Sequence, residues 1–268
     1  MQYCRRVSVP VATRAPTGQT AAYLLGTGNP LLVDPPARSD ELDEAVDAAG
    51  VKHVAVTHTH PDHVGAVEAS ARRTGATVWA RRGREDQFTE ATGIEPDRTF
   101  VDGTRIGPAT VLDTPGHTPE HVAFSVSVSS DDGSTVEHVV TGDLAVAEGS
   151  VVVGAPDGDM RAYLTSLRRL HARDPERLHP AHGPVIDAPR PTLARLLEHR
   201  LDRERRVRQA VDDGAGSLEA VLDEAYDKSL DGVKDLARAT VRAHLRKLAV
   251  ESEFRERRSP YHALRDDH

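Results

Sequence analysis

The sequence predicts an α/β layered domain followed by a smaller helical region. Short apolar runs bounded by turn residues alternate with amphipathic segments through the first 187 residues, as strands alternate with helices in α/β folds. The runs at 122–128 and 136–141 are joined by the turn-rich segment 129–134, which predicts an antiparallel pair. After about residue 187 the pattern becomes charged and helical, with no obvious strand-rich segment.

Each expected element follows from local signals. The apolar runs 21–25 and 30–34 flank a glycine-rich turn and predict a hairpin, and Ser39 and Gly50 bound a predicted helix over 39–49. Further strands are expected at 51–57, 77–80, 109–112, 122–128 and 136–141, and further helices at 64–74, 161–174, 191–211, 217–226 and 233–250. The expected divisions are a domain over 1–188, a helical domain over 189–255 and a flexible tail over 256–268.

Composition narrows the class of protein. The chain of 268 residues carries a net charge of −8, and it has 14 histidines but one cysteine, Cys4. A single cysteine excludes an internal disulfide and a zinc site built from thiolates. No run approaches the roughly 20 apolar residues of a membrane-spanning helix, so we expect a cytoplasmic protein with no membrane partner. Residues 1–188 carry −9 and residues 189–268 carry +1, so the acidity belongs to the first domain.

The most informative segment is 57–66, which holds three histidines and an aspartate within six residues. It follows a predicted strand and precedes a predicted helix, so its side chains lie at the carboxyl end of a strand, where open α/β sheets carry their sites. His58 and His60 point to the same side of an extended backbone, and Asp62 and His63 come just after them. Imidazoles with a carboxylate suit Zn²⁺, Mn²⁺ or Fe²⁺ rather than Ca²⁺.

Three later segments supply matching side chains. His117 and Asp143 each follow a predicted strand, and His182 precedes the change to the helical region. All three lie in loops that contain glycine or proline, where ligands at strand ends belong. His121, close to His117, is expected to hydrogen-bond or pack in the turn rather than bind a metal, and His179, close to His182, is expected to support the site or lie at the surface.

In this order and at this spacing, these residues resemble the metallo-β-lactamase superfamily, whose signature is His-x-His-x-Asp-His followed by His, Asp and His in separate loops. All seven positions are filled, by His58, His60, Asp62, His63, His117, Asp143 and His182. The resemblance, over about residues 15–187, implies a four-layer αββα sandwich and two divalent ions, with Zn²⁺ expected and Mn²⁺ or Fe²⁺ as alternatives. By the same resemblance, the first two histidines and His117 hold one ion, Asp62, His63 and His182 hold the other, and Asp143 bridges both.

The C-terminal region is similar to one branch of that superfamily. Segments 182–186, 198–204 and 241–248 resemble the branch named for β-lactamase-like protein 2, whose members add a small winged-helix-like domain. The resemblance implies such a domain over 189–255. Activity in that branch includes cleavage of single-stranded RNA and of thioesters, so both kinds of substrate are implied for this chain.

The expected function is that of a dinuclear metal-dependent hydrolase, in which a hydroxide bridging the ions attacks a thioester, another ester or a phosphodiester. Asp143 would fix the pair of ions, and Asp62 would carry a proton to the leaving group. The alternatives are a hydroxyacylglutathione hydrolase of the glyoxalase II type, a mononuclear iron persulfide dioxygenase, and a winged-helix module that binds nucleic acid without catalysis. A small (thio)ester and single-stranded RNA both stay open as partners, and a homodimer stays open as the oligomeric state.

A basic stretch on the predicted helix over 191–211 bears on the choice of substrate. It consists of Arg200, Arg203, Arg205, Arg206 and Arg208. The stretch predicts either a solvated face paired with neighbouring acids, or a patch beside the active site that contacts phosphates. Little aromatic sequence is interleaved with it, which weakens a base-stacking mode of RNA binding.

Overall fold

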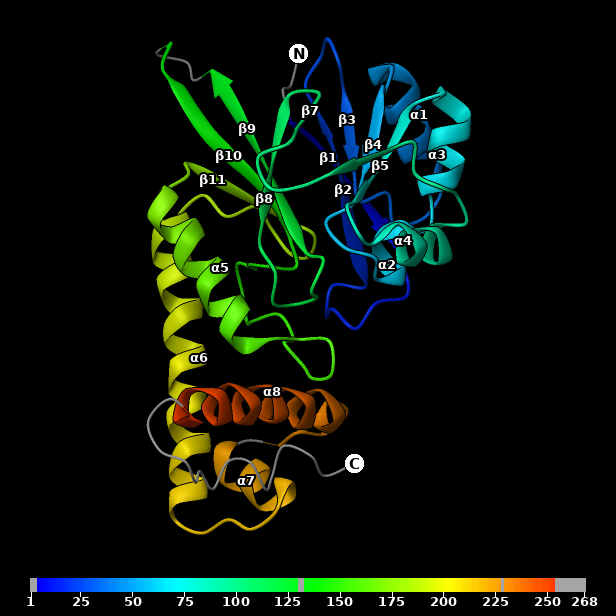
Figure 1. Ribbon diagram of the computed structural model, residues 1–268. Helices are drawn as coiled ribbons and strands as arrows, with labels where there is room; N and C mark the ends of the chain where they lie inside the picture. Colours follow the sequence, from blue (N-terminus) through cyan, green and yellow to red (C-terminus); the bar gives the residue numbers. More distant parts are fainter. Residues whose placement is uncertain (1–3, 130–132, 228, 254–268) are drawn as a thin grey trace.

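Two β-sheets lie face to face, and helices cover both outer sides (Figure 1). The structure is a computed structural model that describes residues 4–129, 133–227 and 229–253. The six-stranded sheet has the order β1 (Cys4–Pro10), β2 (Gln19–Leu25), β3 (Leu31–Val33), β4 (His53–Ala55), β5 (Thr77–Arg81) and β6 (Arg98–Phe100). The five-stranded sheet has the order β11 (Arg177–Pro180), β10 (Thr135–Gly142), β9 (Val122–Ser129), β8 (Ala109–Asp113) and β7 (Arg105–Ile106). The predicted four-layer αββα sandwich is confirmed.

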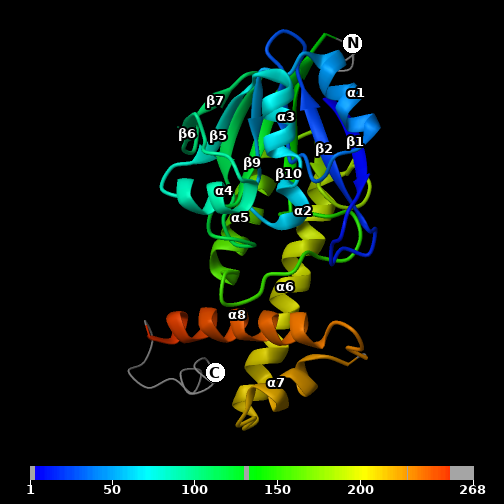
Figure 2. The ribbon, with the colours of Figure 1, turned by 90° about the vertical axis from the view of Figure 1, so that its right-hand side faces the viewer.

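The helices complete the outer layers. On one side α1 (Asp40–Ala49) and α3 (Val67–Thr74) cover the six-stranded sheet, with α2 (Pro61–Val64) and α4 (Glu85–Thr92) near one end of it. On the other side α5 (Met160–Arg173) and the first half of α6 (Pro189–Asp212) cover the five-stranded sheet. The second half of α6 extends beyond the sandwich and carries α7 (Leu218–Ala225) and α8 (Lys234–Glu253), as Figure 2 shows from the side.

Side chains that alternate along the strands separate the sandwich into three apolar layers. On β10, Val139 packs with the cluster under α5, and Val140 packs with the cluster between the sheets. Successive residues of a strand point to opposite faces, so one strand serves both layers. The third layer joins α1 and α3 to the first sheet through residues such as Leu42 and Val67, and a separate cluster around Val241 holds α6, α7 and α8 together.

Most expected elements are present, but one helix is divided. The helix expected over 64–74 begins earlier, at Pro61, and is interrupted after Val64. The Ala66 N–H donates to the Pro35 carbonyl at 3.0 Å, and a Cβ on Gly65 would lie 2.5 Å from the Pro36 oxygen. Close packing against this proline pair therefore separates α2 from α3.

Several elements were not anticipated from the sequence. These are β1, α4, β6, β7 and β11, most of which are short strands or edge elements. In the C-terminal region the described residues of 189–253 form helices and no strand, so the helical part of that prediction is confirmed and no wing is seen there. The boundary at 188/189 stays a prediction, although α6 begins at Pro189. The predicted tail over 256–268 lies outside the described residues.

No helix within the described part of the chain is both long enough and apolar enough to cross a membrane.

Loss of packing between α5 and the five-stranded sheet should be costly. Leu167 is fully buried in this layer, so Leu167→Ala should lower the free energy of unfolding by about 2–5 kcal/mol, through lost apolar burial and the cavity left behind. Urea denaturation followed by circular dichroism measures this change. Val101→Ala, at a 42% exposed position, is the matched control and should shift stability by less than about 0.5 kcal/mol. Equal effects of the two substitutions would contradict the assignment of Leu167 to the core.

Candidate metal centre

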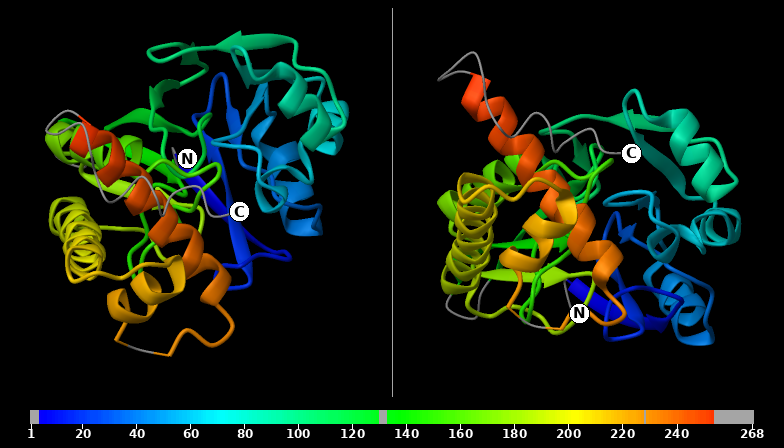
Figure 3. Two further views of the ribbon diagram at one scale, coloured as in Figure 1. Left: turned by 60° about the horizontal axis from the view of Figure 1, so that its bottom comes forward. Right: turned by 90° about the horizontal axis from the view of Figure 1, so that it is seen from below.

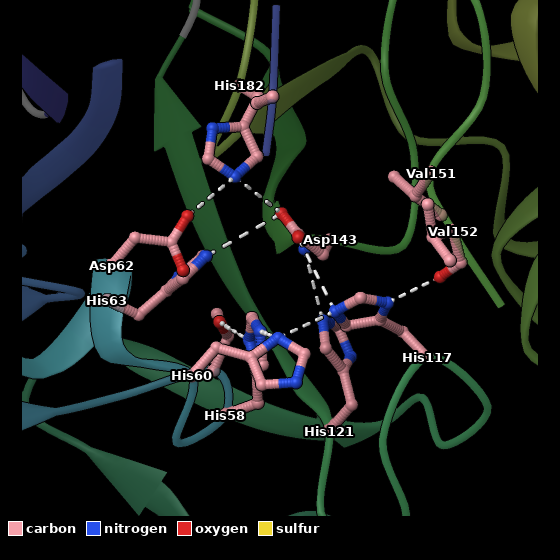
Figure 4. A network of polar contacts seen from close by, with 12 residues as sticks. His58, His60, Asp62, His63, His117, His121, Asp143, Val151, Val152 and His182 are labelled. Atoms are coloured by element: carbon pink, nitrogen blue, oxygen red, sulfur yellow. Dashed lines mark hydrogen bonds and ion pairs between the residues drawn. The ribbon is translucent and has the colours of Figure 1, made fainter. Parts of the chain in front are cut away.

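Seven histidine and aspartate side chains converge where loops from both sheets meet (Figure 4). His58, His60, Asp62 and His63 come from the loop after β4 and from α2. His117 follows β8, Asp143 follows the end of β10, and His182 follows β11. The seven residues predicted as ligands are therefore clustered in space, although they span more than 120 positions of the chain. Their assignment as ligands stays a prediction, which the following geometry supports.

The first group consists of His58, His60 and His117, whose ring nitrogens face one another. His58 Nε2 lies 2.9 Å from His60 Nδ1, and His117 Nε2 lies 3.1 Å from the same atom. Tetrahedral zinc with bonds of 2.0–2.1 Å brings its nitrogen ligands to about 3.3 Å from one another. The separations of the three nitrogens are therefore close to those needed to coordinate one such ion.

Hydrogen bonds on the outer side hold these rings in one orientation. His117 Nδ1 donates to the Val152 carbonyl at 2.7 Å, which leaves Nε2 free to face inward. Thr57 Oγ1 donates to Asp34 at 2.8 Å and accepts from His58 Nδ1 at 3.1 Å. Burial and the neighbouring imidazoles also lower the pKa of His58 well below its ordinary value. His58 is therefore neutral, which is the form that binds a metal.

The second group consists of Asp62, His63 and His182. His182 Nε2 lies 3.5 Å from Asp62 Oδ2, and its Nδ1 donates to the Gln19 carbonyl at 3.0 Å. His63 is fully buried, and its Nδ1 donates to Asp34 at 3.1 Å. As in the first group, an outer hydrogen bond from Nδ1 orients each imidazole and directs Nε2 toward the centre.

Asp143 lies between the two groups with one oxygen toward each. Its Oδ2 is 3.5 Å from His117 Nε2 in the first group. Its Oδ1 is 3.3 Å from His182 Nε2 and 3.7 Å from His63 Nε2 in the second group. Burial raises the pKa of this carboxyl, but the surrounding imidazoles lower it by a larger amount. The net pKa lies below its ordinary value, so the carboxylate stays ionised. A single carboxylate is thus positioned to contact an ion in each group.

Unpartnered buried atoms indicate that the cluster suits metal ions. His63 Nε2 and Asp143 Oδ1 are buried, and neither has a hydrogen-bond partner among the described residues. Burial alone lowers the pKa of His63, but Asp34 and Asp143 raise it to about 9. Burying such groups without partners is costly, and coordination to a cation would satisfy both of them. The donor set of imidazoles and carboxylates fits Zn²⁺, Mn²⁺ or Fe²⁺.

His121 contacts the backbone of Asp143 and does not direct a ring nitrogen into the cluster. Its Nε2 accepts from the Asp143 N–H at 3.2 Å, so its Nδ1 carries the proton and donates to Thr114. Burial lowers the pKa of His121 to about 3, which keeps the ring neutral and in this tautomer. The expected supporting role of His121 fits this geometry. His179 points elsewhere, toward His138 and Cys4, and takes no part in the cluster.

A glycine allows the close approach of the Asp143 loop. Gly142 has a φ of +49°, and a Cβ there would lie 2.5 Å from Thr57 Oγ1 and 2.9 Å from His121 Nε2. Both contacts are shorter than real Cβ contacts allow. Only glycine fits between the two residues that orient His58 and Asp143.

Asp34 is the supporting residue that sequence reasoning missed. It is fully buried, has a φ of +50°, and accepts from the Thr57 N–H, the Thr57 hydroxyl and His63. One carboxylate therefore orients ligands of both groups, directly for His63 and through Thr57 for His58. The available signal was its position directly after a buried strand, at the same sheet edge as the histidine motif.

A cavity of about 790 Å³ opens beside the cluster. It reaches His60, Asp62, His117, Asp143 and His182, and its other walls come from residues 12–17, from residues 146–152 and from Leu236. Among its lining residues Arg14 is the only lysine or arginine, and it is paired with Asp235 at 3.0 Å. The cavity is the place where a substrate can reach the centre.

The five arginines of the basic stretch on α6 make contacts within the protein. Arg200 is buried, donates to the Val151 carbonyl and lies over the Tyr163 ring, and Arg203 lies 3.6 Å above the Tyr226 ring. The other three arginines pair with acids: Arg205 with Asp202, Arg206 with Asp227, and Arg208 with Glu204. None of the five lines the cavity, so this stretch does not form a phosphate-binding wall there.

Comparisons with known proteins agree with the architecture. The family model described as "Metallo-beta-lactamase superfamily" matches residues 15–182. The chain is 28% identical over 204 residues to a "Beta-lactamase-like protein 2 homolog" from Caenorhabditis elegans, a match that covers 70% of this chain and 64% of the relative. It is 26% identical over 267 residues to the protein of the same name from Drosophila melanogaster, with 90% and 85% covered. An "Atrochrysone carboxyl ACP thioesterase" from Aspergillus chevalieri is 29% identical, with 72% and 60% covered.

Solved structures are similar as well. A metallo-beta-lactamase family protein from Thermus thermophilus has a TM-score of 0.70 at 21% identity, covering 93% of this chain and 94% of that one. A protein solved in a di-iron-bound form has a TM-score of 0.52 at 31% identity, covering 72% of this chain and 97% of that one.

Removal of the charge at Asp34 should weaken metal binding. Asp34→Asn keeps the shape but weakens the hydrogen bond that directs His63, and its amide opposes one of the two Thr57 donors. We expect metal affinity to fall about 10–100-fold, as for other residues that orient metal ligands. Competition with a zinc chelator measures this. Asp47→Asn, at an exposed surface pair, is the control, and an Asp34→Asn affinity equal to that of the control would refute the role.

Proposed function

The chain belongs to the metallo-beta-lactamase superfamily, and on that premise we propose that it is a dinuclear metal-dependent hydrolase of thioesters or related acyl esters. The observation that carries the proposal is a pair of ligand groups, joined by one carboxylate, that opens on a cavity without a free basic side chain. The fungal relative is named as a thioesterase.

The two groups support two ions rather than one. His58, His60 and His117 would hold the first, Asp62, His63 and His182 the second, and Asp143 would contact both. Zn²⁺ is the expected metal, with Mn²⁺ and Fe²⁺ as alternatives, and the similar protein in a di-iron-bound form supports two positions. When bound, the ions would supply an activated water and neutralise negative charge that develops on the substrate.

The chain's own side chains then have defined roles. Asp143 keeps the two groups in register because its oxygens face opposite sides. Asp62 lines the cavity, so its carboxylate can hold a proton and deliver it to the leaving group. The outer hydrogen bonds to Asp34, Thr57, Val152 and Gln19 keep the imidazoles oriented throughout the reaction.

Charge around the cavity favours an ester over an RNA phosphodiester. Binding of a nucleic-acid backbone depends on lysine and arginine side chains that contact phosphates. The one arginine of the cavity is paired with Asp235, and the arginines of α6 are directed at other parts of the protein. A neutral thioester or ester group needs no such contacts.

Catalysis should depend on Asp62 and discriminate between the two substrate classes. We expect hydrolysis of acyl thioesters, such as glutathione thioesters, with a rate that falls at least about 100-fold in Asp62→Ala. Thioester and single-stranded RNA are assayed side by side, and the thermal unfolding temperature of the variant shows that it is folded. Asp62-dependent cleavage of RNA without thioester hydrolysis would overturn the ester assignment, and activity independent of Asp62 would overturn the hydrolase proposal.

Metal removal should abolish activity, and two equivalents of metal should restore it. A chelator strips the ions from the full chain, Zn²⁺ is added back stepwise, and elemental analysis counts the bound metal. Full recovery is expected at two ions per chain because the cluster offers two separate triads of candidate ligands. A fully active protein with one iron per chain would instead support the mononuclear dioxygenase alternative.

A further inference from the structure

One leucine of the C-terminal helix α8 faces the cavity instead of the core. Ala237, Val241 and Leu245 of the same helix belong to the cluster that joins α8 to α6 and α7. Leu236 is half-buried, belongs to none of the described hydrophobic clusters, and lines the cavity beside the metal centre. Seen from below, α8 crosses the end of the sandwich (Figure 3). The family match ends at residue 182, so this wall comes from outside it.

A second wall comes from residues 12–17. Its apolar side chains are Ala12, Ala15 and Pro16, which lie beside Thr13 and Thr17, and the Arg14–Asp235 pair links this loop directly to the first turn of α8. Both side chains of that pair are more than 60% exposed, so the pair contributes little to stability. It places this loop next to α8.

The third wall is residues 146–152, and α6 holds it in place. Arg195 donates to the carbonyls of Val146, Ala147 and Gly149, at 3.1, 2.9 and 2.8 Å. Arg200 donates to the carbonyl of Val151. This loop presents Val146, Val151 and Val152 to the cavity beside Glu148 and Ser150, so the arginines of α6 organise a wall with three valines rather than a phosphate site.

Helix α8 holds the continuation of the same loop. The Ala155 N–H donates to the Ala239 carbonyl at 3.1 Å, and a Cβ on Gly154 would lie 2.8 Å from the Ala239 Cβ. Arg246 donates to the Pro156 carbonyl at 3.2 Å. The C-terminal helices therefore shape two of the three walls, one through Leu236 and one through residues 146–156.

We propose that the C-terminal helices complete an acyl-binding subsite, which takes an unbranched apolar acyl group of the substrate and selects it over a short one. The inference rests on the proposed esterase function, because the acyl carbon must reach the metal centre while its chain lies between Leu236, the valines and residues 12–17. A volume of about 790 Å³ lies within the range of small-molecule sites and exceeds what an acetyl group needs. Each methylene that leaves water strengthens binding by about fourfold.

Binding of octanoate and acetate tests the subsite without requiring turnover. Both ions carry the same carboxylate, so any contact with the metal centre is common to both, and the ratio of their dissociation constants reports the chain alone. Isothermal titration calorimetry on the full, metal-loaded protein should give octanoate at least about tenfold tighter than acetate, because several methylenes are buried. Equal affinities would overturn the proposal.

A charge at position 236 should remove this preference. Leu236→Asp lies in the first turn of α8, where an acidic side chain is compatible with the helix, so the variant should fold. We expect the octanoate-to-acetate ratio to fall at least about tenfold, since the apolar wall becomes charged. Val233→Asp, at a 45% exposed position that does not line the cavity, is the matched control and should keep the wild-type ratio. A ratio unchanged in Leu236→Asp, or lost equally in both variants, would contradict the subsite.

A kinetic comparison distinguishes failure of the subsite proposal from failure of the proposed function. With octanoyl and acetyl thioesters of the same thiol, kcat/KM should favour octanoyl in the wild type, and Leu236→Asp should remove that preference while acetyl turnover changes little. Octanoate binding that depends on Leu236, without hydrolysis of any ester, would leave the subsite standing and overturn the function. Hydrolysis of both esters at equal kcat/KM, without preferential octanoate binding, would overturn the subsite and leave the function.

Discussion

The fixed orientation of the clustered imidazoles is the constraint on which the rest of the site depends. Four of the five ligand histidines donate from Nδ1 to a partner outside the cluster, at Thr57, Asp34, Val152 and Gln19, and thereby direct Nε2 inward. Without those partners each ring could rotate or exchange tautomers. With them, the inner nitrogens and the Asp143 carboxylate are held close together, and fixing that arrangement is the costly part of building a metal site.

The same constraint accounts for several local features of the fold. Asp34 is buried in a left-handed backbone conformation, Gly142 leaves no room for a Cβ beside Thr57, and Gly65 packs directly on Pro36. Each brings the loop of one strand against that of another at the same edge of the sandwich. These three positions lie where the loops that make the outer hydrogen bonds approach one another.

The convergence of the seven candidate ligands could be predicted from the sequence because their positions are encoded locally. Four lie in one short motif after a buried strand, and the other three follow strands whose carboxyl ends meet at one edge. Asp34 also follows a buried strand, but its role, like that of Val152, depends on contact with a histidine far along the chain, 29 and 35 positions away respectively, and neither residue type is distinctive. Short elements such as β6 and β7 were missed for a related reason, since pairing with neighbouring strands rather than their own sequence defines them.

The structure shows a role for the basic residues of α6 that the sequence alone left open. The basic stretch of α6 could have been a solvated face or a phosphate-binding patch, but its arginines bind carbonyl groups, aromatic faces and nearby acids. Arg195 and Arg200 hold the loop whose Val152 carbonyl orients His117, so the helical region acts on the metal centre through backbone geometry. The ligands come from the sandwich, and the C-terminal helices fix the loop between ligand and cavity. Changes in these helices can therefore alter which substrate fits without altering the ligands themselves.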